Sequence, residues 1–205
     1  MNAGLQYRVE QFLYRHAELC DAQDWDGYLA QFDEQCEFHL PQWESEQRYT
    51  RDPKREMSLI YYPSRAGLED RVFRIRTGKA ASTVPMPRTL HQIGNVRIAE
   101  EGEGLLRVRV NWQTLFQRLD QTGSFFGHAT YRLKPHGEAW LIARKHIVLL
   151  NDRQTIGGYP RLGALAPLAL ARLAQCLPGQ RVRLLPTVQE AAHREHRRLL
   201  AAWDA

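Results

Sequence analysis

Four side chains of this sequence have the chemistry for proton transfer in a pocket: Asp24, Tyr28, His91 and His128. A carboxylate, a phenol and two imidazoles of this kind could serve an isomerase or a dehydratase on a curved sheet. Each also has a structural interpretation, because Asp24 precedes a helical pattern as an N-cap, Tyr28 fits a core, and core histidines bond to their neighbours. We favour the structural interpretation.

Metal binding is a second chemistry to consider. A two-histidine, one-carboxylate iron site could draw its histidines from His91, His128 and His146 if these faced the inside of one curved sheet. A histidine on an apolar strand is, however, more often a hydrogen-bonded core residue. His193 and His196 could share a helix face, but the arginines around them would repel a cation. We therefore expect no metal site in this chain.

The three cysteines are odd in number and widely spaced, which favours reduced thiols over a disulfide framework or a zinc site: Cys20, Cys36 and Cys176. A Rieske cluster needs a Cys-x-His segment paired with a Cys-x-x-His segment, and no cysteine here has a histidine two residues later. Nucleotide-binding glycine loops and the G-x-S-x-G, C-x-x-C and H-E-x-x-H motifs are also missing from the sequence. Because these motifs are missing, we expect no catalytic site of these types in this chain.

The elements that must position these residues begin with helices. Helical spacing predicts one amphipathic helix through Leu5, Val9, Phe12, Leu13, His16 and Cys20. A second helix should start after Asp24 and carry Trp25, Tyr28, Leu29 and Phe32. A short strand over 36–40, a polar loop over 42–56, a strand over 57–62 and a helix from Ser64 to Gly78 are expected to follow.

Strands dominate the later part of the chain. Within residues 106–116, the even-numbered positions are apolar except for Thr114, and the odd-numbered positions from 107 to 113 are polar. This alternation is typical of a half-buried antiparallel strand. Similar segments over 90–98, 124–134 and 139–150, separated by glycine-containing turns, complete a meander. The order predicts an α+β fold in which a curved antiparallel sheet packs against helices from the N-terminal end.

The expected helix from Ser64 has a heavily charged face, formed by Arg65, Glu69, Asp70, Arg71, Arg74 and Arg76. Most such faces are solvated and contribute little to stability, since exposed ion pairs are weak. The alternative is a surface that binds another subunit, where arginine is enriched. Both interpretations stay open on the residues alone.

The formal net charge of +5 comes from one end of the chain. Residues 1–152 contain 20 basic and 20 acidic residues, whereas residues 153–205 contain 8 arginines, no lysine and 3 acidic residues. The first part is neutral and lacks interleaved basic and aromatic side chains, so we expect no nucleic-acid binding. We find no apolar run of membrane-spanning length and no secretory signal, so the expected compartment is the cytoplasm.

Three segments are distinctive together: MSLIYY at 57–62, RAGLEDRVFRIRTG at 65–78 and PRTLHQI at 87–93. With them, the first 152 residues resemble the small (β) subunits of aromatic-ring-hydroxylating dioxygenases, with the anthranilate branch nearest and the benzoate and toluate types next. Segments 38–43 (FHLPQW) and 52–56 (DPKRE) resemble the anthranilate branch most.

The resemblance implies a cone-shaped α+β fold of the nuclear-transport-factor-2 type (NTF2-like) and a structural, non-catalytic role. In that family a large (α) subunit carries the Rieske [2Fe–2S] cluster and mononuclear Fe(II), and the assembly is typically α3β3. A separate reductase delivers electrons from NADH through FAD and an iron–sulfur centre. The implied reaction is dihydroxylation of anthranilate, giving catechol, or of benzoate, giving a cis-diol. Under this resemblance, the charged helix gains weight as a subunit interface.

The resemblance ends near Asp152, so we predict an NTF2-like domain over 1–152 and an atypical Arg/Ala/Leu-rich tail over 153–205. The tail is expected to be either an added helical segment or the product of a shifted reading frame near codon 153. Two other functions stay open for the domain: a free-standing isomerase or dehydratase that uses the four pocket residues named first, and a ligand-binding module.

Overall fold

The computed structural model describes residues 3–79 and 84–152. The tail predicted over 153–205 lies outside the described residues. Two helices open the described part, α1 (Ala3–Asp21) and α2 (Trp25–Ala30). The predicted stripe of α1 is confirmed, because Val9, Leu13 and His16 are buried along it. Asp24 caps α2 as predicted, since its carboxylate accepts a hydrogen bond from the Gly27 amide at 3.0 Å.

Six strands form one sheet in the order β2-β1-β6-β5-β4-β3. Their bounds are β1 (Phe32–Pro41), β2 (Ser58–Tyr62), β3 (Arg88–Glu100), β4 (Leu106–Arg118), β5 (Gln121–His136) and β6 (Ala139–Leu149). Strands β3 to β6 are the expected antiparallel meander, and β2 is antiparallel to β1. The β1–β6 pair is parallel, which the sequence did not predict. This pair joins the early hairpin to the last strand of the meander.

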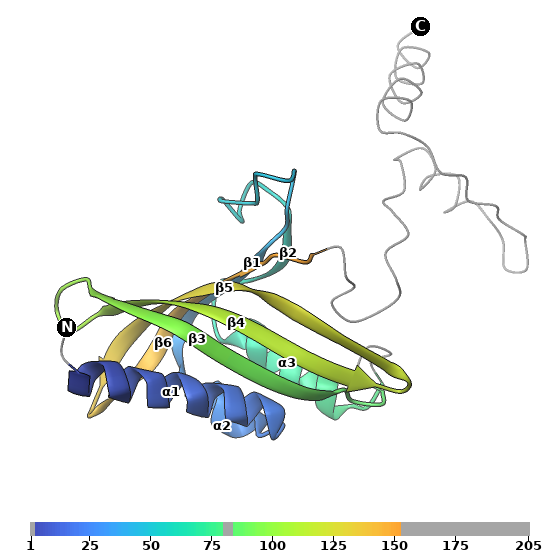
Figure 1. Ribbon diagram of the computed structural model, residues 1–205, viewed down its shortest axis with the longest axis horizontal. Coiled ribbons are helices and arrows are strands. Elements are labelled where there is room, and N and C mark those ends of the chain that lie inside the picture. The colour runs from blue at the N-terminus through green and yellow to red at the C-terminus, as the bar shows by residue number, and fades with distance from the viewer. Residues whose placement is uncertain (1–2, 80–83, 153–205) are drawn as a thin grey trace, which may run out of the picture. The chain divides into compact units, whose positions relative to one another are not determined.

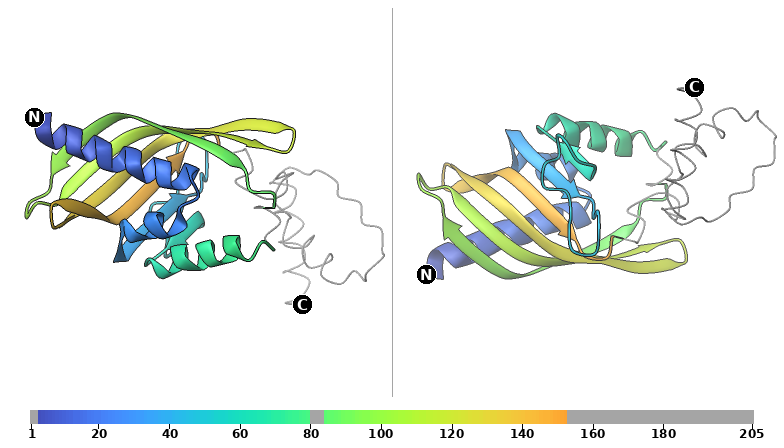
Figure 2. Two further views of the ribbon diagram at one scale, coloured as in Figure 1. Left: turned by 90° about the horizontal axis from the view of Figure 1, so that it is seen from below. Right: turned by 90° about the horizontal axis from the view of Figure 1, so that it is seen from above.

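The core lies between α1 and the inner face of the curved sheet, and α1 crosses the strands on that face (Figures 1 and 2). Strand β4 shows the predicted alternation, with Leu106, Val108 and Val110 buried and the intervening residues exposed. These side chains pack with Val9 and Leu13 of α1. The α+β architecture expected from the sequence is therefore confirmed.

The third helix, α3 (Ala66–Arg76), packs closely on β2. Gly67 permits this approach, since a Cβ atom there would lie 2.4 Å from the ring of Tyr62. The helix ends at Arg76 with Thr77 as its C-cap, and Gly78, the expected terminator, follows with a φ of +63°. No described helix is long and apolar enough to cross a membrane.

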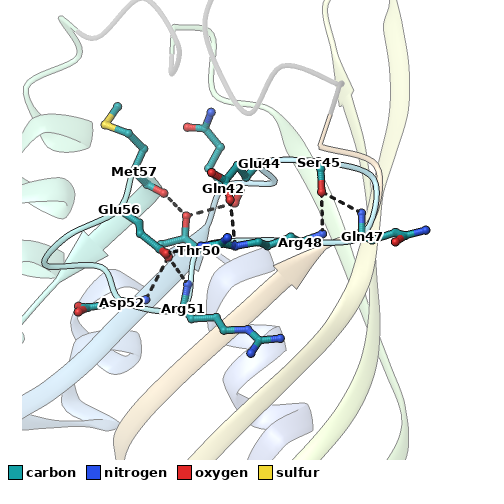
Figure 3. Close-up of polar contacts among 10 residues, drawn as sticks. All are labelled: Gln42, Glu44, Ser45, Gln47, Arg48, Thr50, Arg51, Asp52, Glu56 and Met57. Atoms are coloured by element: carbon teal, nitrogen blue, oxygen red, sulfur yellow. Dashed lines mark hydrogen bonds and ion pairs between the residues drawn. The ribbon is translucent and has the colours of Figure 1, made fainter.

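The polar loop between β1 and β2 is held together by its own hydrogen bonds (Figure 3). The Glu56 carboxylate accepts bonds from the backbone amides of Arg51 and Asp52 and from the Arg48 guanidinium, at 2.7, 3.3 and 2.9 Å. These bonds lower the pKa of Glu56, the backbone ones most. Thr50 is buried and donates to backbone oxygens of Gln42 and Met57. A segment without a core pattern thus has a defined conformation.

Candidate functional site

A cavity of about 460 Å³ lies between the helices and the inner face of the sheet. All three helices and the inward-facing positions of the strands contribute to its lining. Six aromatic side chains form much of the wall: Trp25, Tyr28, Phe38, Trp112, Phe125 and Tyr131. The described residues that line the cavity include Lys145 and Arg71 but no aspartate or glutamate. The cavity is therefore aromatic and positively charged.

Lys145 occupies an inward position at the centre of the sheet, opposite Phe38 of β1 and Tyr131 of β5. Its Nζ lies 5.9 and 5.5 Å from the centres of those two rings and 5.7 Å from that of Tyr28. At these distances the ring faces attract the ammonium. Burial lowers the pKa of Lys145 to about 8, so the ammonium still predominates at pH 7.

His16 of α1 is the hydrogen-bond partner of this lysine. Its Nε2 lies 2.8 Å from Lys145 Nζ, and its Nδ1 lies 2.7 Å from the Gln31 side-chain oxygen. The ammonium can only donate and the Gln31 oxygen can only accept, so His16 is the neutral tautomer with its proton on Nδ1. Burial, followed by the charge of Lys145, holds the pKa of His16 well below its usual value. The two contacts fix the lysine within the cavity.

A second polar group joins the end of α1 to β3. Asp21 accepts hydrogen bonds from Thr89 Oγ1 at 2.8 Å, from the His91 amide at 2.8 Å and from His91 Nδ1 at 2.5 Å. Burial acts to raise the pKa of Asp21, but the bonds from His91 and Thr89 together lower it. Burial lowers the pKa of His91 despite its carboxylate partner. The arrangement leaves His91 Nε2 as a second polar atom on a residue that lines the cavity.

The four residues proposed for acid/base chemistry do not come together. Tyr28 and His91 line the cavity, and burial raises the pKa of Tyr28 well above its usual value. Asp24 is exposed and serves as the helix cap. His128 lies on the outer face of the sheet, because Ala129 and Tyr131 occupy the inward positions of β5. Asp24 and His128 therefore lie apart from the cavity.

The three histidines considered as iron ligands also do not come together. His146 lies on the outer face, where its ring is 5.0 Å from that of His39, while His91 faces the cavity. Burial lowers the pKa of His146 to about 4. Cys36 and His39 have Cys-x-x-His spacing, but Cys36 belongs to the core whereas His39 bonds to Ser58 at 3.0 Å. Within residues 3–79 and 84–152, no group of three potential ligands could hold a metal ion.

The charged side chains of α3 fall into two groups. Arg65 is only 27% exposed and donates to Glu69 at 2.8 Å and to the Phe32 carbonyl at 3.2 Å, which ties the start of the helix to β1. Arg76 pairs with Asp26 at 2.8 Å. Asp70, Arg71 and Arg74 are exposed, and none of them forms an ion pair within the part of the chain that the structure describes.

Sequence reasoning missed the polar residues that matter most in the cavity: His16 as a polar contact, Asp21 and Lys145. His16 was assigned only to a helix stripe. Lys145 stands two and four residues before Ile147 and Leu149, which share its inward face. That spacing was the available signal, since a lysine in phase with buried residues must lie inside the sheet.

Comparisons with known proteins agree on one family. The family model described as ring hydroxylating beta subunit matches residues 15–155. The chain is 51% identical over 153 residues to the anthranilate 1,2-dioxygenase small subunit of Acinetobacter baylyi, which covers 75% of this chain and 94% of that protein. It is 40% identical over 153 residues to the toluate 1,2-dioxygenase subunit beta of Pseudomonas putida, with 74% and 94% coverage.

Solved structures show the same fold. The beta subunit of benzoate 1,2-dioxygenase from Burkholderia mallei has 40% identity and a TM-score of 0.60, covering 70% of this chain and 89% of that one. A putative scytalone dehydratase from Novosphingobium aromaticivorans shares the fold at 14% identity and a TM-score of 0.56, covering 78% and 95%. A carboxyltransferase-domain model matches residues 141–186, most of which lie outside the described residues.

Proposed function

Because this chain belongs to the ring-hydroxylating β-subunit family and is the small subunit of an aromatic-ring-hydroxylating dioxygenase, we propose that its enzyme converts anthranilate to catechol. The observation that carries the substrate is the 51% identity with an anthranilate 1,2-dioxygenase small subunit. Identity falls to 42% with a benzoate 1,2-dioxygenase subunit beta and to 40% with the toluate relative. We propose a structural, non-catalytic role in the cytoplasm for this chain.

The proposed partner is a large subunit that holds the Rieske [2Fe–2S] cluster and the mononuclear Fe(II), in an α3β3 assembly. NADH and FAD would act through a separate reductase. The two cysteines among the described residues support this division, because Cys20 and Cys36 are poor thiolate ligands. Burial raises the pKa of each thiol to about 11.

The proposed interface includes the charged face of α3: Arg65, Glu69, Asp70, Arg71, Arg74 and Arg76. A second exposed area supports pairing through the sheet, because Leu90 and Leu115 lie opposite each other on β3 and β4 and are 52% and 37% exposed. Adjacent exposed leucines are a common feature of a surface that another subunit covers.

Residues 1–152 form the working domain in this proposal, and the family match over 15–155 supports that boundary. Resequencing the gene across codon 153 tests the tail. An intact reading frame with a stop codon after Ala205 would contradict a frameshift, and a shifted frame would contradict an added native segment.

The free-standing isomerase or dehydratase is not favoured. The relatives with 40% identity or more are dioxygenase subunits, whereas the dehydratase shares only the fold. In addition, Asp24 and His128 lie outside the cavity.

Co-expression of the full chain with an anthranilate-type large subunit tests the proposal. We expect the two chains to elute together, and the complex, supplied with reductase and NADH, to form catechol from anthranilate faster than a cis-diol from benzoate. The large subunit alone and this chain alone are the controls. Failure of the two chains to co-purify, together with turnover by this chain alone, would contradict the proposal.

A further inference from the structure

We propose that the cavity between the helices and the sheet is a binding site for a small aromatic carboxylate, with the carboxylate at Lys145 Nζ and the ring among the aromatic side chains. Nothing in the dihydroxylation reaction requires this site, so the inference does not rest on the proposed function. It concerns binding by this chain and includes no chemical step.

The charge of the cavity is the first support. A buried ammonium is costly unless an anion or several acceptors compensate it. Lys145 has one hydrogen-bond partner among the described residues, the neutral ring of His16. Arg71 adds a second positive charge to the lining, and no carboxylate among the described lining residues offsets either. A carboxylate ligand would supply the missing negative charge and accept hydrogen bonds that His16 alone cannot.

The position of the lysine is the second support. Lys145 is flanked by Phe38 and Tyr131 on the two neighbouring strands, and Tyr28 approaches it from α2. His16 stacks on Tyr28 with ring centres 4.8 Å apart, so the group around the ammonium is packed in place before any ligand arrives. Preorganised contacts of this kind reduce the entropy lost on binding.

The size and walls of the cavity select an aromatic ligand. A volume of about 460 Å³ lies within the range of roughly 300–1,000 Å³ that small-molecule sites span. Trp112 and Phe125 extend the aromatic wall away from the lysine along β4 and β5. Rings favour offset or edge contacts with such walls. A single aromatic ring with one carboxylate matches both the walls and the cation.

His91 is a further polar group on the cavity lining. Asp21 holds its Nδ1, and its Nε2, which has no hydrogen-bond partner among the described residues, can accept a hydrogen bond from a ligand. The positive charge of Lys145 contributes to the lowered pKa of His91, so the two groups interact electrostatically.

Calorimetric titration of the purified full chain tests the site, with benzoate as the probe and benzamide as its neutral match. We expect benzoate to bind at least tenfold more tightly than benzamide. Lys145→Met removes the charge and keeps most of the length of the side chain, and it should weaken benzoate binding at least tenfold while leaving benzamide binding unchanged. Lys79→Met makes the same chemical change at an exposed lysine and should leave both unchanged.

Equal binding of benzoate and benzamide by the unaltered chain would overturn the proposal without any variant. Undiminished benzoate binding by a Lys145→Met chain with a native circular dichroism spectrum would also overturn it. Absence of benzoate binding at millimolar concentrations would do the same. If Lys145→Met does not fold, Lys145→Arg retains the charge, and loss of its benzoate affinity to the benzamide level would count against a charge-based site.

Discussion

The cavity and the outer surface of α3 both contain charged side chains, yet the two regions use charge differently. In the cavity, Lys145 lies among aromatic rings, and its one hydrogen-bond partner in the described part of the chain is the neutral ring of His16. On α3, Asp70 and Arg74 are exposed to solvent, which hydrates and screens them. We therefore expect Lys145, half-buried inside the cavity, to affect stability more than the exposed charges of α3.

The largest effect is expected where a buried contact joins two elements. Asp21→Ala removes the acceptor of three hydrogen bonds that connect α1 to β3. Bonds to a charged group contribute about 1.5–3 kcal/mol each but do not add fully, so we expect a loss of about 3 kcal/mol in the free energy of unfolding. Urea denaturation measures it. Asp26→Ala, in an exposed pair with Arg76, is the control and should cost less than about 0.5 kcal/mol. Equal losses of stability in Asp21→Ala and Asp26→Ala would contradict the expected difference between the buried contact and the exposed ion pair.

The next effect is the pH dependence of Lys145. Its pKa falls from the ordinary value of 10.5 to about 8 on folding, so between pH 8 and 10.5 the unfolded chain binds more protons than the folded one. Stability from this group therefore rises with pH across that window. The stability of Lys145→Met relative to the unaltered chain should decline by about 2–3 kcal/mol from pH 8 to 10.5, allowing for the cavity-facing surface of the side chain.

Denaturation at several pH values measures this difference, in which contributions from the other titrating groups cancel. Lys79→Met, at an exposed position, is the matched control and should show no such trend. A flat difference for Lys145→Met would mean that the ammonium is solvated, and the cavity and α3 would then not differ as described.

An effect of intermediate size is expected at Arg65. Arg65→Met leaves the Phe32 carbonyl without its side-chain donor and removes the bond to Glu69, so we expect a loss of about 1 kcal/mol in the free energy of unfolding. Glu69→Gln separates the two contacts, because it weakens only the exposed one. If both variants lose the same stability, the bond to the backbone contributes nothing.

The smallest effect on this chain alone is expected at the exposed charges of α3. Arg74→Gln and Asp70→Asn should each change the free energy of unfolding by less than about 0.5 kcal/mol. The same variants should weaken co-elution with the large subunit if α3 lies at the interface. Gel filtration of the co-expressed chains measures this, and unchanged assembly in both variants would place the interface elsewhere.

Much of the fold could be predicted because local patterns agree with it. The alternation of Leu106, Val108 and Val110 fixed the inward face of β4, and Asp24 marked the start of α2. The parallel pairing of β1 with β6 could not be predicted, because it joins segments about 107 residues apart, as in the Arg144–Glu37 bond. Partners so distant are chosen by tertiary packing and leave no local pattern.

The candidate site was predicted less well than the fold. Tyr28 and His91 were identified, but Asp21 was missed because its partner lies 70 residues away. His128 was considered for the interior although Ala129 and Tyr131, the buried neighbours in β5, indicate the opposite phase. The alternation of each strand predicts on which face of the sheet a polar residue lies. By this rule Lys145 lies on the inner face and His128 on the outer face.

The contacts of α1 with β3 also bear on solubility. β3 is one of the two outer strands of the sheet, and an outer strand offers free backbone groups to which a strand of another molecule can add. Asp21 accepts a hydrogen bond from the backbone amide of His91. Near the other end of α1, Gln6 donates to the backbone oxygen of Val96 at 3.2 Å. The helix thus protects this edge at two points along its length. Loss of Asp21 would expose one of them and favour aggregation of otherwise folded chains.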